Sequence, residues 1–355
     1  MLETDLFWTF ITILSTVIEW IVLRFLLEEI SKLKKSKIQL NMSLLIASII
    51  VLILTIIEFN INIKLFICIM ITYFIYTYNY EVDIKETGSK GDATSIVAKY
   101  PSCDLLISIG GDGTFNEVMT GNFKRKERLT LCHLPSGTTN DIGAMWGYGK
   151  NLISNLKLAL DGEVKRIDVC TINNRPFVYT AGFGKFMNIP YETPRKLKKR
   201  LGHLAYIKEG IKDFFRKVKS YDVTYEIDGE EYRGLFSFAI ITNANRVAGI
   251  NNFYKDIKLN DNKFEVLLCN ITRLHDLVKA LYFFTKYDAS RIPGFYFYKT
   301  DNLTIKFNKP LKKALCIDGE SLPDLSGKYE IKIDHDVHVL MPSKNINTLF
   351  IDDKK

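Results

Sequence analysis

The chain has 355 residues, a formal net charge of +8 and a hydrophobic content of 47%, which is ample for a sizeable core and allows two or three structural units. Its six cysteines form no close pair, so the sequence indicates neither a zinc site nor a disulfide framework, consistent with a reducing cytoplasm. No recognisable nucleic-acid reader module accompanies the positive charge, which argues against a nucleic-acid partner.

Three long apolar stretches lie near the N-terminus, at residues 6–27, 40–57 and 63–78. Each approaches the roughly 20 residues that a helix needs to cross a bilayer, so residues 1–80 are predicted to be a membrane region with about three transmembrane helices. Buried helices of a soluble protein are the alternative. A cleaved signal peptide is not expected, because the first residues are acidic and more apolar stretches follow.

The connectors between these stretches differ in charge. Residues 28–38 contain four lysines, whereas residues 58–62 contain no basic residue. By the positive-inside rule the first connector is cytoplasmic, and three spans then place everything after Tyr80 in the cytoplasm. The chain is therefore expected in the cell membrane as a multi-pass protein with a cytoplasmic catalytic part. A topology with two spans is the alternative.

Residues 81–163 alternate apolar strand-like runs with helix-like segments, the pattern of an α/β domain with a parallel sheet. A glycine-rich turn at 110–114 (GGDGT) follows the strand-like run 104–109 and precedes a helix-like segment. Glycines let the backbone approach an anion, and a helix start presents unpaired N–H groups. The sequence therefore predicts a phosphate site, with an ordinary tight turn as the alternative.

A second polar turn, residues 137–141 (GTTND), follows the apolar run 129–134. Two polar turns at successive strand ends are expected to meet at the carboxyl edge of the sheet. A carboxylate at Asp112 would repel phosphate unless a cation lies between them, so the turn also predicts magnesium nearby.

From residue 164 to 345 the pattern changes to short alternating strands, at 167–172, 177–182, 221–227, 235–242, 264–271 and 303–307. This predicts a mainly antiparallel β-rich domain, with a helix-like insertion at 197–219 and a short tail at 346–355. Residues 195–219 are strongly basic with interleaved apolar side chains, which suits an anionic membrane surface. A solvated basic helix face explains the same pattern.

Asp318-Gly319-Glu320 follows the apolar run 314–317, and such a turn is expected to expose both carboxylates at a strand end. A base is needed to phosphorylate an alcohol, and these carboxylates are candidates. The same three letters occur at 228–230, where a simple hairpin explains them. The residues alone do not separate the two copies.

About three quarters of the chain, from residue 82 onward, resembles the diacylglycerol kinase catalytic family of bacterial lipid kinases. NAD kinases and phosphofructokinases share a similar first glycine turn, whereas the later motifs favour a lipid kinase. The resemblance is carried by GGDGTFNEV at 110–118, PSGTTNDIG at 135–143, ETGSKGDA at 86–93, TAGFGKF at 180–186, LGHLAY at 201–206 and Asp318-Gly319-Glu320.

The resemblance implies an α/β nucleotide-binding domain, a β-sandwich domain and a cleft between them. It implies that Asp318 and Glu320 are the catalytic carboxylates and that Asp112 and Asp141 organise Mg2+. A structural magnesium would be held by the Asp261 side chain and the carbonyls of Lys258 and Lys263. The residues expected at ATP are Thr87, Gly110, Gly111, Asp112, Gly113, Thr114, Asn116, Glu117, Gly137, Thr138, Asn140 and Asp141.

The chain departs from the family at its start, because it lacks the usual first strand and Asn-Pro-x-Ser-Gly phosphate loop before residue 86. Three interpretations are open. The third apolar stretch can replace the missing strand, or the site can bind phosphate without the missing loop. Alternatively, the chain has little or no catalytic activity.

The expected function is transfer of the γ-phosphoryl group of ATP to a lipid alcohol, with diacylglycerol as acceptor and phosphatidic acid as product. The alternatives are a membrane sensor that binds nucleotide without turnover and an NAD kinase-like enzyme. The sequence leaves homo-oligomer formation open.

Overall fold

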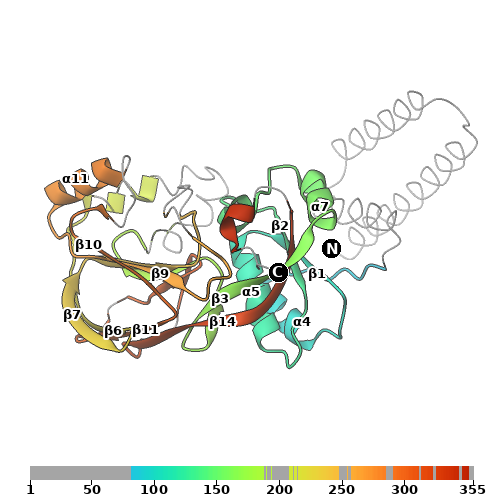
Figure 1. The fold of residues 1–355 in the computed structure, drawn as a ribbon, viewed down its shortest axis with the longest axis horizontal. Helices are drawn as coiled ribbons and strands as arrows, with labels where there is room; N and C mark the ends of the chain where they lie inside the picture. Colours follow the sequence, from blue (N-terminus) through green and yellow to red (C-terminus); the bar gives the residue numbers. More distant parts are fainter. Residues whose placement is uncertain are drawn as a thin grey trace, which may run out of the picture. The chain divides into compact units, whose positions relative to one another are not determined.

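The computed structural model describes residues 81–351, apart from 188, 190–192, 194–207, 211, 214, 248–253, 255–256, 285–290, 312, 323–324 and 344–345. The apolar stretches 6–27, 40–57 and 63–78 lie outside the described residues, and so does most of the helix expected at 197–219. No helix in the described part is both long and apolar enough to cross a membrane. Residues Lys85–Lys355 form one compact unit (Figure 1).

The first part of this unit alternates helices and strands as the sequence predicts. Strand β1 pairs in parallel with β2, and α5 packs against α4 so closely that a Cβ on Gly121 would lie 2.7 Å from the carbonyl oxygen of Thr94. The elements are α4 (Asp92–Lys99), β1 (Leu106–Gly110), α5 (Asp112–Phe123), β2 (Leu131–Pro135), α6 (Asp141–Met145) and α7 (Leu152–Leu160).

The second part is mainly antiparallel strand. Its elements are β3 (Glu163–Ile172), β4 (Arg175–Phe177), β5 (Thr180–Gly184), β6 (Tyr221–Ile227), β7 (Glu230–Phe236), β8 (Phe238–Thr242), β9 (Phe264–Cys269), α11 (Leu274–Phe284), β10 (Phe295–Thr300), β11 (Asn302–Phe307), β12 (Cys316–Ile317), β13 (Glu320–Ser321), β14 (Lys328–Met341) and η2 (Asn347–Leu349). The predicted α/β layer with a β-rich part after it is confirmed.

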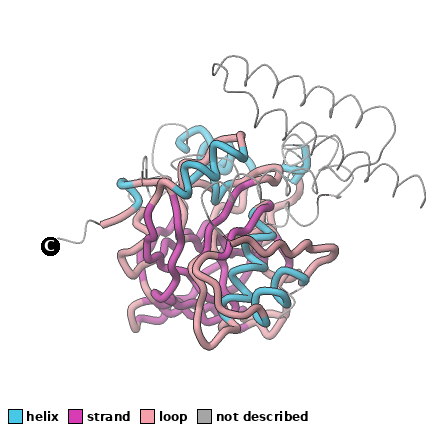
Figure 2. Tube along the Cα trace, turned by 90° about the vertical axis from the view of Figure 1, so that its right-hand side faces the viewer, coloured by secondary structure: helices cyan, strands magenta, loops and turns pink. Residues whose placement is uncertain are grey.

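The strands form two sheets with a shared core. One sheet has the order β1-β2-β14-β11-β6-β7, with β3 paired to β14 and β4 to β3; the other has the order β10-β9-β8-β5-β12-β13. Ile305, Tyr329 and Ile331 of the first sheet belong to the same buried cluster as Ile241 and Phe264 of the second. Figure 2 shows the strands gathered in one block with helices outside it.

Several predicted strands end where a side chain or a carbonyl elsewhere takes over their hydrogen bonds. The run 177–182 is divided between β4 and β5, because the N–H groups of Val178 and Tyr179 donate to the Asp318 carboxylate. The run 235–242 is divided at Ser237, whose N–H donates to the carbonyl of Cys269 at 2.7 Å.

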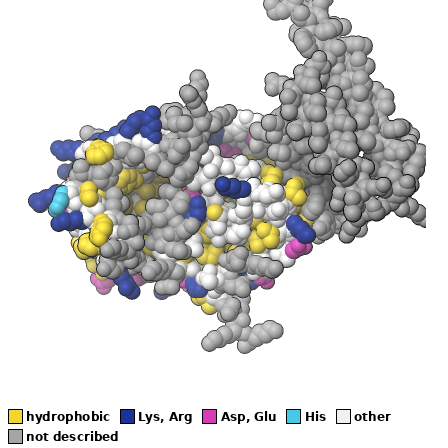
Figure 3. Space-filling model, turned by 90° about the horizontal axis from the view of Figure 1, so that it is seen from above, with side chains coloured by type: hydrophobic (Ala, Val, Ile, Leu, Met, Phe, Trp, Pro, Cys, Tyr) yellow, Lys and Arg dark blue, Asp and Glu magenta, His cyan; other side chains and the backbone are white. Residues whose placement is uncertain are grey.

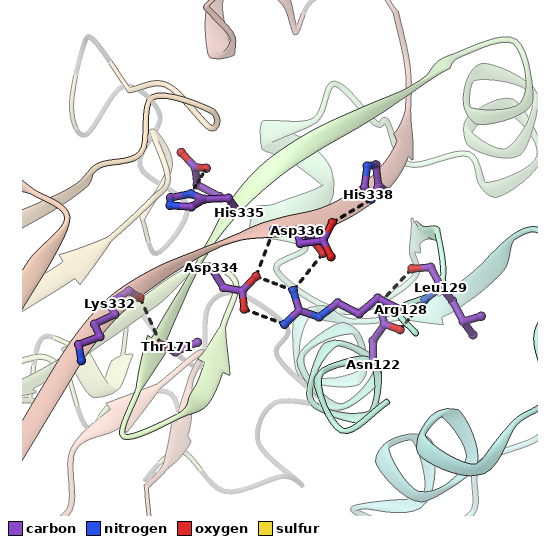
Figure 4. A network of polar contacts seen from close by, with 10 residues as sticks. Asn122, Arg128, Leu129, Thr171, Lys332, Asp334, His335, Asp336 and His338 are labelled. Atoms are coloured by element: carbon purple, nitrogen blue, oxygen red, sulfur yellow. Dashed lines mark hydrogen bonds and ion pairs between the residues drawn. The ribbon is translucent and has the colours of Figure 1, made fainter. Parts of the chain in front are cut away.

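Strand β14 connects the two parts and was not predicted. It pairs in parallel with β2 at Val339 and Leu340 and antiparallel with β3 and β11, with an irregularity in the β3 register between Asp334 and Val337. At that irregularity Arg128, from the segment before β2, donates to both carboxylate oxygens of Asp334 (Figure 4). A strand from the end of the chain thus completes the sheet of the predicted nucleotide domain.

Candidate functional site

The two glycine-rich turns meet at the carboxyl edge of the parallel pair β1 and β2, as predicted. The N–H of Ser136 donates to the carbonyl of Gly110 at 2.7 Å. A Cβ on Gly137 would lie 2.5 Å from the Cα of Gly111, so the two backbones touch. Asn140, at a positive φ of 53°, closes the second turn by accepting from the N–H of Gly137 and donating to its carbonyl. The approach of the two backbones therefore requires glycine at 137 and leaves little room for a Cβ at 111, which would lie 3.2 Å from the Cα of Gly137.

The Asp112 carboxylate connects the two glycine-rich turns, and its expected role at magnesium remains a prediction. Its two oxygens accept the N–H groups of Asp141 and Ile142, each at 3.1 Å, and thereby cap the first turn of α6. Burial raises the pKa of Asp112 to about 6, and these backbone donors oppose the shift. The carboxylate therefore holds the two turns together.

Asp141 is buried in an ionic network that the sequence did not reveal. One carboxylate oxygen accepts the hydroxyl of Tyr179 at 2.8 Å, and the other accepts the Nε of Arg246 at 2.7 Å. Arg246 lies after β8, more than a hundred residues along the chain, in a stretch with no local motif. Only long-range packing brings it to the glycine turns.

The Asp318 carboxylate is buried, so the expectation that both carboxylates of the turn are exposed is wrong for this residue. It accepts three backbone N–H groups, from Val178, Tyr179 and Thr180, at 2.8 to 2.9 Å, and the Asn116 amide at 2.6 Å. A carboxylate offers about four lone-pair positions, so these donors occupy its capacity. Burial raises the pKa of Asp318, while the donors favour the charged form.

Glu320 projects toward the first glycine turn. One of its carboxylate oxygens lies 3.9 Å from the position a Cβ would take on Gly113, and the other is 2.5 Å from the Nζ of Lys90. The side chain is 30% exposed. The late Asp-Gly-Glu turn and the first glycine turn are thus brought together, with Glu320 as the accessible carboxylate.

The earlier Asp228-Gly229-Glu230 copy forms the hairpin between β6 and β7, as expected. Its aspartate and glycine have φ angles of 54° and 82°, close to the 46° and 80° of Asp318 and Gly319. The two copies therefore share a local conformation and differ in what surrounds them.

The remaining residues expected at ATP lie around the same edge but in different environments. Asn116 is buried and points its amide at Asp318. Glu117 accepts the N–H of Gly91 at 2.9 Å and so fixes the start of α4. Thr138 is exposed, and Thr87 is half-buried in the segment before α4. The ATP contacts of these residues remain predictions.

Asp261, the side chain expected at a structural magnesium, has protein partners, and the magnesium contacts of Asp261, Lys258 and Lys263 remain predictions. Asp261 accepts the Lys263 N–H at 3.2 Å and pairs with the Nζ of Lys299 at 2.6 Å, and the Lys258 ammonium donates to the carbonyl of Thr348. Asn262 has the left-handed conformation, with φ of 61°, that the sequence allowed. Within the described ranges no three His, Cys, Asp or Glu side chains gather into a metal-binding group.

Comparison with known proteins agrees with this geometry. Residues 70–172 match the diacylglycerol kinase catalytic domain. The chain is 29% identical to a diacylglycerol kinase of Bacillus subtilis over 272 residues, which cover 76% of this chain and 88% of that protein. A diacylglycerol kinase of Staphylococcus saprophyticus is 28% identical over 265 residues, covering 74% of this chain and 86% of its own length.

A solved structure shares the fold. The crystal structure of a diacylglycerol kinase from Bacillus anthracis has a TM-score of 0.61 and 24% identity to this chain, and the match covers 74% of this chain and 86% of that one. The family resemblance expected from the motifs is confirmed by the match of residues 70–172 and by the relatives.

Proposed function

We propose that this chain, whose residues 70–172 match the diacylglycerol kinase catalytic domain, is an ATP-dependent lipid kinase that converts diacylglycerol to phosphatidic acid. The observation that carries the proposal is the convergence of both glycine turns with the Glu320 carboxylate at one sheet edge. Phosphoryl transfer needs these two parts, a close backbone cradle for the phosphates and a nearby proton acceptor.

The roles of the two carboxylates follow from their surroundings. Glu320, partly exposed beside Gly113, accepts the proton of the attacking hydroxyl. The hydroxyl oxygen bonds to the γ-phosphorus while the bond to the β,γ-bridging oxygen breaks and ADP leaves. Asp318 positions Glu320, because its four hydrogen bonds fix the turn that carries both residues.

We propose that the chain uses ATP together with Mg2+, which would neutralise phosphate charge when bound. The Asp112 and Asp141 carboxylates already accept backbone N–H groups, a tyrosine hydroxyl and an arginine. They shape the cradle proposed for the nucleotide, and they are the carboxylates at this edge that would hold the ion.

We also propose that the three apolar stretches anchor the enzyme in the cell membrane with its catalytic part in the cytoplasm. The lipid substrate stays in the bilayer, so the site must work at its surface.

Helix α11 exposes Val278 and Tyr282, one turn apart, next to basic Lys279, and Phe215 is 70% exposed within the basic segment 195–219. Figure 3 shows lysine and arginine side chains gathered at the left end of the described part, the end at which Figure 1 draws α11. Charge and apolar side chains of this kind suit an anionic membrane.

The membrane proposal is tested by fractionation and by activity in nanodiscs. The full chain should stay with membranes after alkaline carbonate washing. In detergent-free nanodiscs, the rate of lipid phosphorylation should rise with the content of anionic phospholipid. Release of the chain by carbonate would contradict anchoring by transmembrane helices.

The activity is tested with radiolabelled ATP and diacylglycerol in mixed micelles. The wild-type chain should form labelled phosphatidic acid, and Glu320→Gln should lower kcat by about 100-fold or more, the usual scale for loss of a general base. Glu230→Gln changes the matching residue of the second Asp-Gly-Glu turn and should keep wild-type activity. Nucleotide binding by a wild-type chain that phosphorylates no lipid would contradict the kinase assignment, and label in NADP would redirect it to NAD.

A further inference from the structure

Lys90 lies in the 86–93 stretch and pairs with Glu320, and it is not among the residues expected at ATP. The next residue, Gly91, donates its N–H to Glu117 of α5 at 2.9 Å. Asp92 accepts the N–H groups of Gly88 and Ser89 at 2.9 and 2.7 Å. These bonds fix the backbone on both sides of Lys90, while its side chain is 61% exposed and can change direction.

The ammonium of Lys90 is held by the proposed proton acceptor. Its Nζ is 2.5 Å from one oxygen of Glu320, whose other oxygen faces Gly113 of the glycine turn. In this position one carboxylate, that of Glu320, contacts the Lys90 ammonium with one oxygen and faces the glycine turn with the other. An exposed ion pair contributes little to stability, so a more highly charged ligand can exchange for either partner.

The carboxylates around the glycine turns would repel a triphosphate unless a cation compensates the negative charge. Asp112, Asp141 and Asp318 are all acidic, and the guanidinium of Arg246 is bound to Asp141. A triphosphate brings further negative charge to this edge, and the chain has no Asn-Pro-x-Ser-Gly loop before residue 86. Phosphate cradles commonly add a lysine to their backbone N–H groups for this reason.

We propose that Lys90 is a phosphate-binding residue whose ammonium leaves Glu320 for the phosphates of ATP, so that nucleotide binding frees the proton acceptor. The inference deepens the proposed function and rests on it for the role of Glu320. During transfer the hydroxyl proton passes to Glu320, the new oxygen–phosphorus bond forms, and the Lys90 ammonium faces the charge that develops on departing ADP. The Glu320 carboxylate is therefore separated from the Lys90 ammonium only when ATP is bound. Without ATP, the ion pair disfavours transfer of a proton to Glu320.

The test is calorimetric binding of a non-hydrolysable ATP analogue, and separately of adenosine, to the full chain in detergent micelles. Lys90→Ala should weaken the analogue about tenfold or more, as expected for loss of a charge-assisted hydrogen bond, and leave adenosine affinity unchanged. Lys90→Arg should restore most of the affinity. Glu320→Gln should bind the analogue several-fold more tightly, because the ammonium no longer has a competing carboxylate.

The matched control is Lys99→Ala, which removes an exposed lysine from the last turn of α4 and should bind both ligands as the wild type does. Unchanged analogue affinity in Lys90→Ala, or an equal loss for adenosine, would overturn the inference. If the wild-type chain binds the analogue through Lys90 but phosphorylates no lipid, the proposed function fails while phosphate binding by Lys90 stands.

Discussion

Asp318 and Glu320 are two residues apart, yet they meet different physical conditions. Asp318 is buried and accepts hydrogen bonds from four donors. Glu320 is partly exposed and forms an ion pair with the exposed ammonium of Lys90. A buried carboxylate with its hydrogen bonds satisfied contributes to structure, and an accessible one can exchange partners and protons. The two residues should therefore respond differently to removal of charge.

Asp318→Asn should lower the free energy of unfolding by about 3 kcal/mol, because the amide nitrogen cannot accept the backbone N–H groups that the carboxylate accepts. Glu320→Gln should change it by less than about 0.5 kcal/mol, as for most exposed substitutions. Urea titrations of the two variants measure this difference. Equal stability losses would mean that both carboxylates are structural.

His133 lies in β2 just before the second glycine turn and is fully buried, with its ring stacked on Phe115 at 4.6 Å. Burial lowers the pKa of His133 to about 4, from an ordinary value of 6.5. In the unfolded chain the imidazole protonates below pH 6.5, while in the folded chain it stays neutral until about pH 4. Stability from this residue is therefore complete above pH 6.5 and is lost as the pH falls toward 4.

The size of this effect is about 3 kcal/mol, from the difference between the two pKa values. Thermal unfolding of His133→Phe should lose less stability than the wild type between pH 6.5 and 4. His338→Gln, which changes an exposed histidine, should keep the wild-type pH dependence. Parallel curves for His133→Phe and the wild type would contradict the buried neutral state of His133.

The two glycine turns act as one element because their backbones touch. Gly137→Ala should force Gly111 away, since a Cβ would stand 2.5 Å from its Cα and backbone cannot yield as a flexible side chain can. We expect affinity for ATP to fall about tenfold or more, with a smaller loss of thermal stability. Gly149→Ala is the control, because its Cβ would meet only the Asn155 oxygen at 3.9 Å. Retained ATP affinity in Gly137→Ala would show that the contact is not required.

Elements with a local signal were predictable, and elements defined by distant partners were not. The apolar runs 104–109 and 129–134 were found because each is followed by glycine and polar residues that end a strand, and β1 and β2 lie there within a few residues. Strand β14 escaped prediction because charged and polar residues such as Asp334 and His335 interrupt its apolar pattern. Those side chains bind Arg128 and Asp168 from other segments.

At the scale of the whole described unit, Arg128 ties the segment before β2 to the irregularity in β14. It makes a bidentate pair with Asp334, donates to the Asp336 carbonyl at 3.0 Å and lies 4.1 Å from the centre of the Phe123 ring. Arg128→Gln should lower the free energy of unfolding by about 2 kcal/mol, and Arg128→Lys should recover less than half of it, because an ammonium cannot form the fork.

Arg233→Gln is the matched control. Arg233 makes the same two-pronged contact with Asp222 on β6, but its side chain is 67% exposed, so little change is expected. Chemical denaturation with two probes, tryptophan fluorescence and circular dichroism, measures both variants. A loss in Arg233→Gln as large as that in Arg128→Gln would contradict the importance of burial.

The sequence by itself determined the glycine turns, the order of α/β and β-rich parts and the family resemblance, because these depend on local spacing and residue type. The residue letters alone do not separate the two Asp-Gly-Glu turns, which also have nearly the same backbone angles, and only the family resemblance selects the later one. The tertiary structure surrounds Asp318 with donors from α5, from the link between β4 and β5 and from the start of β5. It places Glu320 against Gly113, whereas Asp228 accepts the Thr300 hydroxyl. A turn acquires a chemical role from the groups that folding brings to it, and those groups lie up to two hundred residues away.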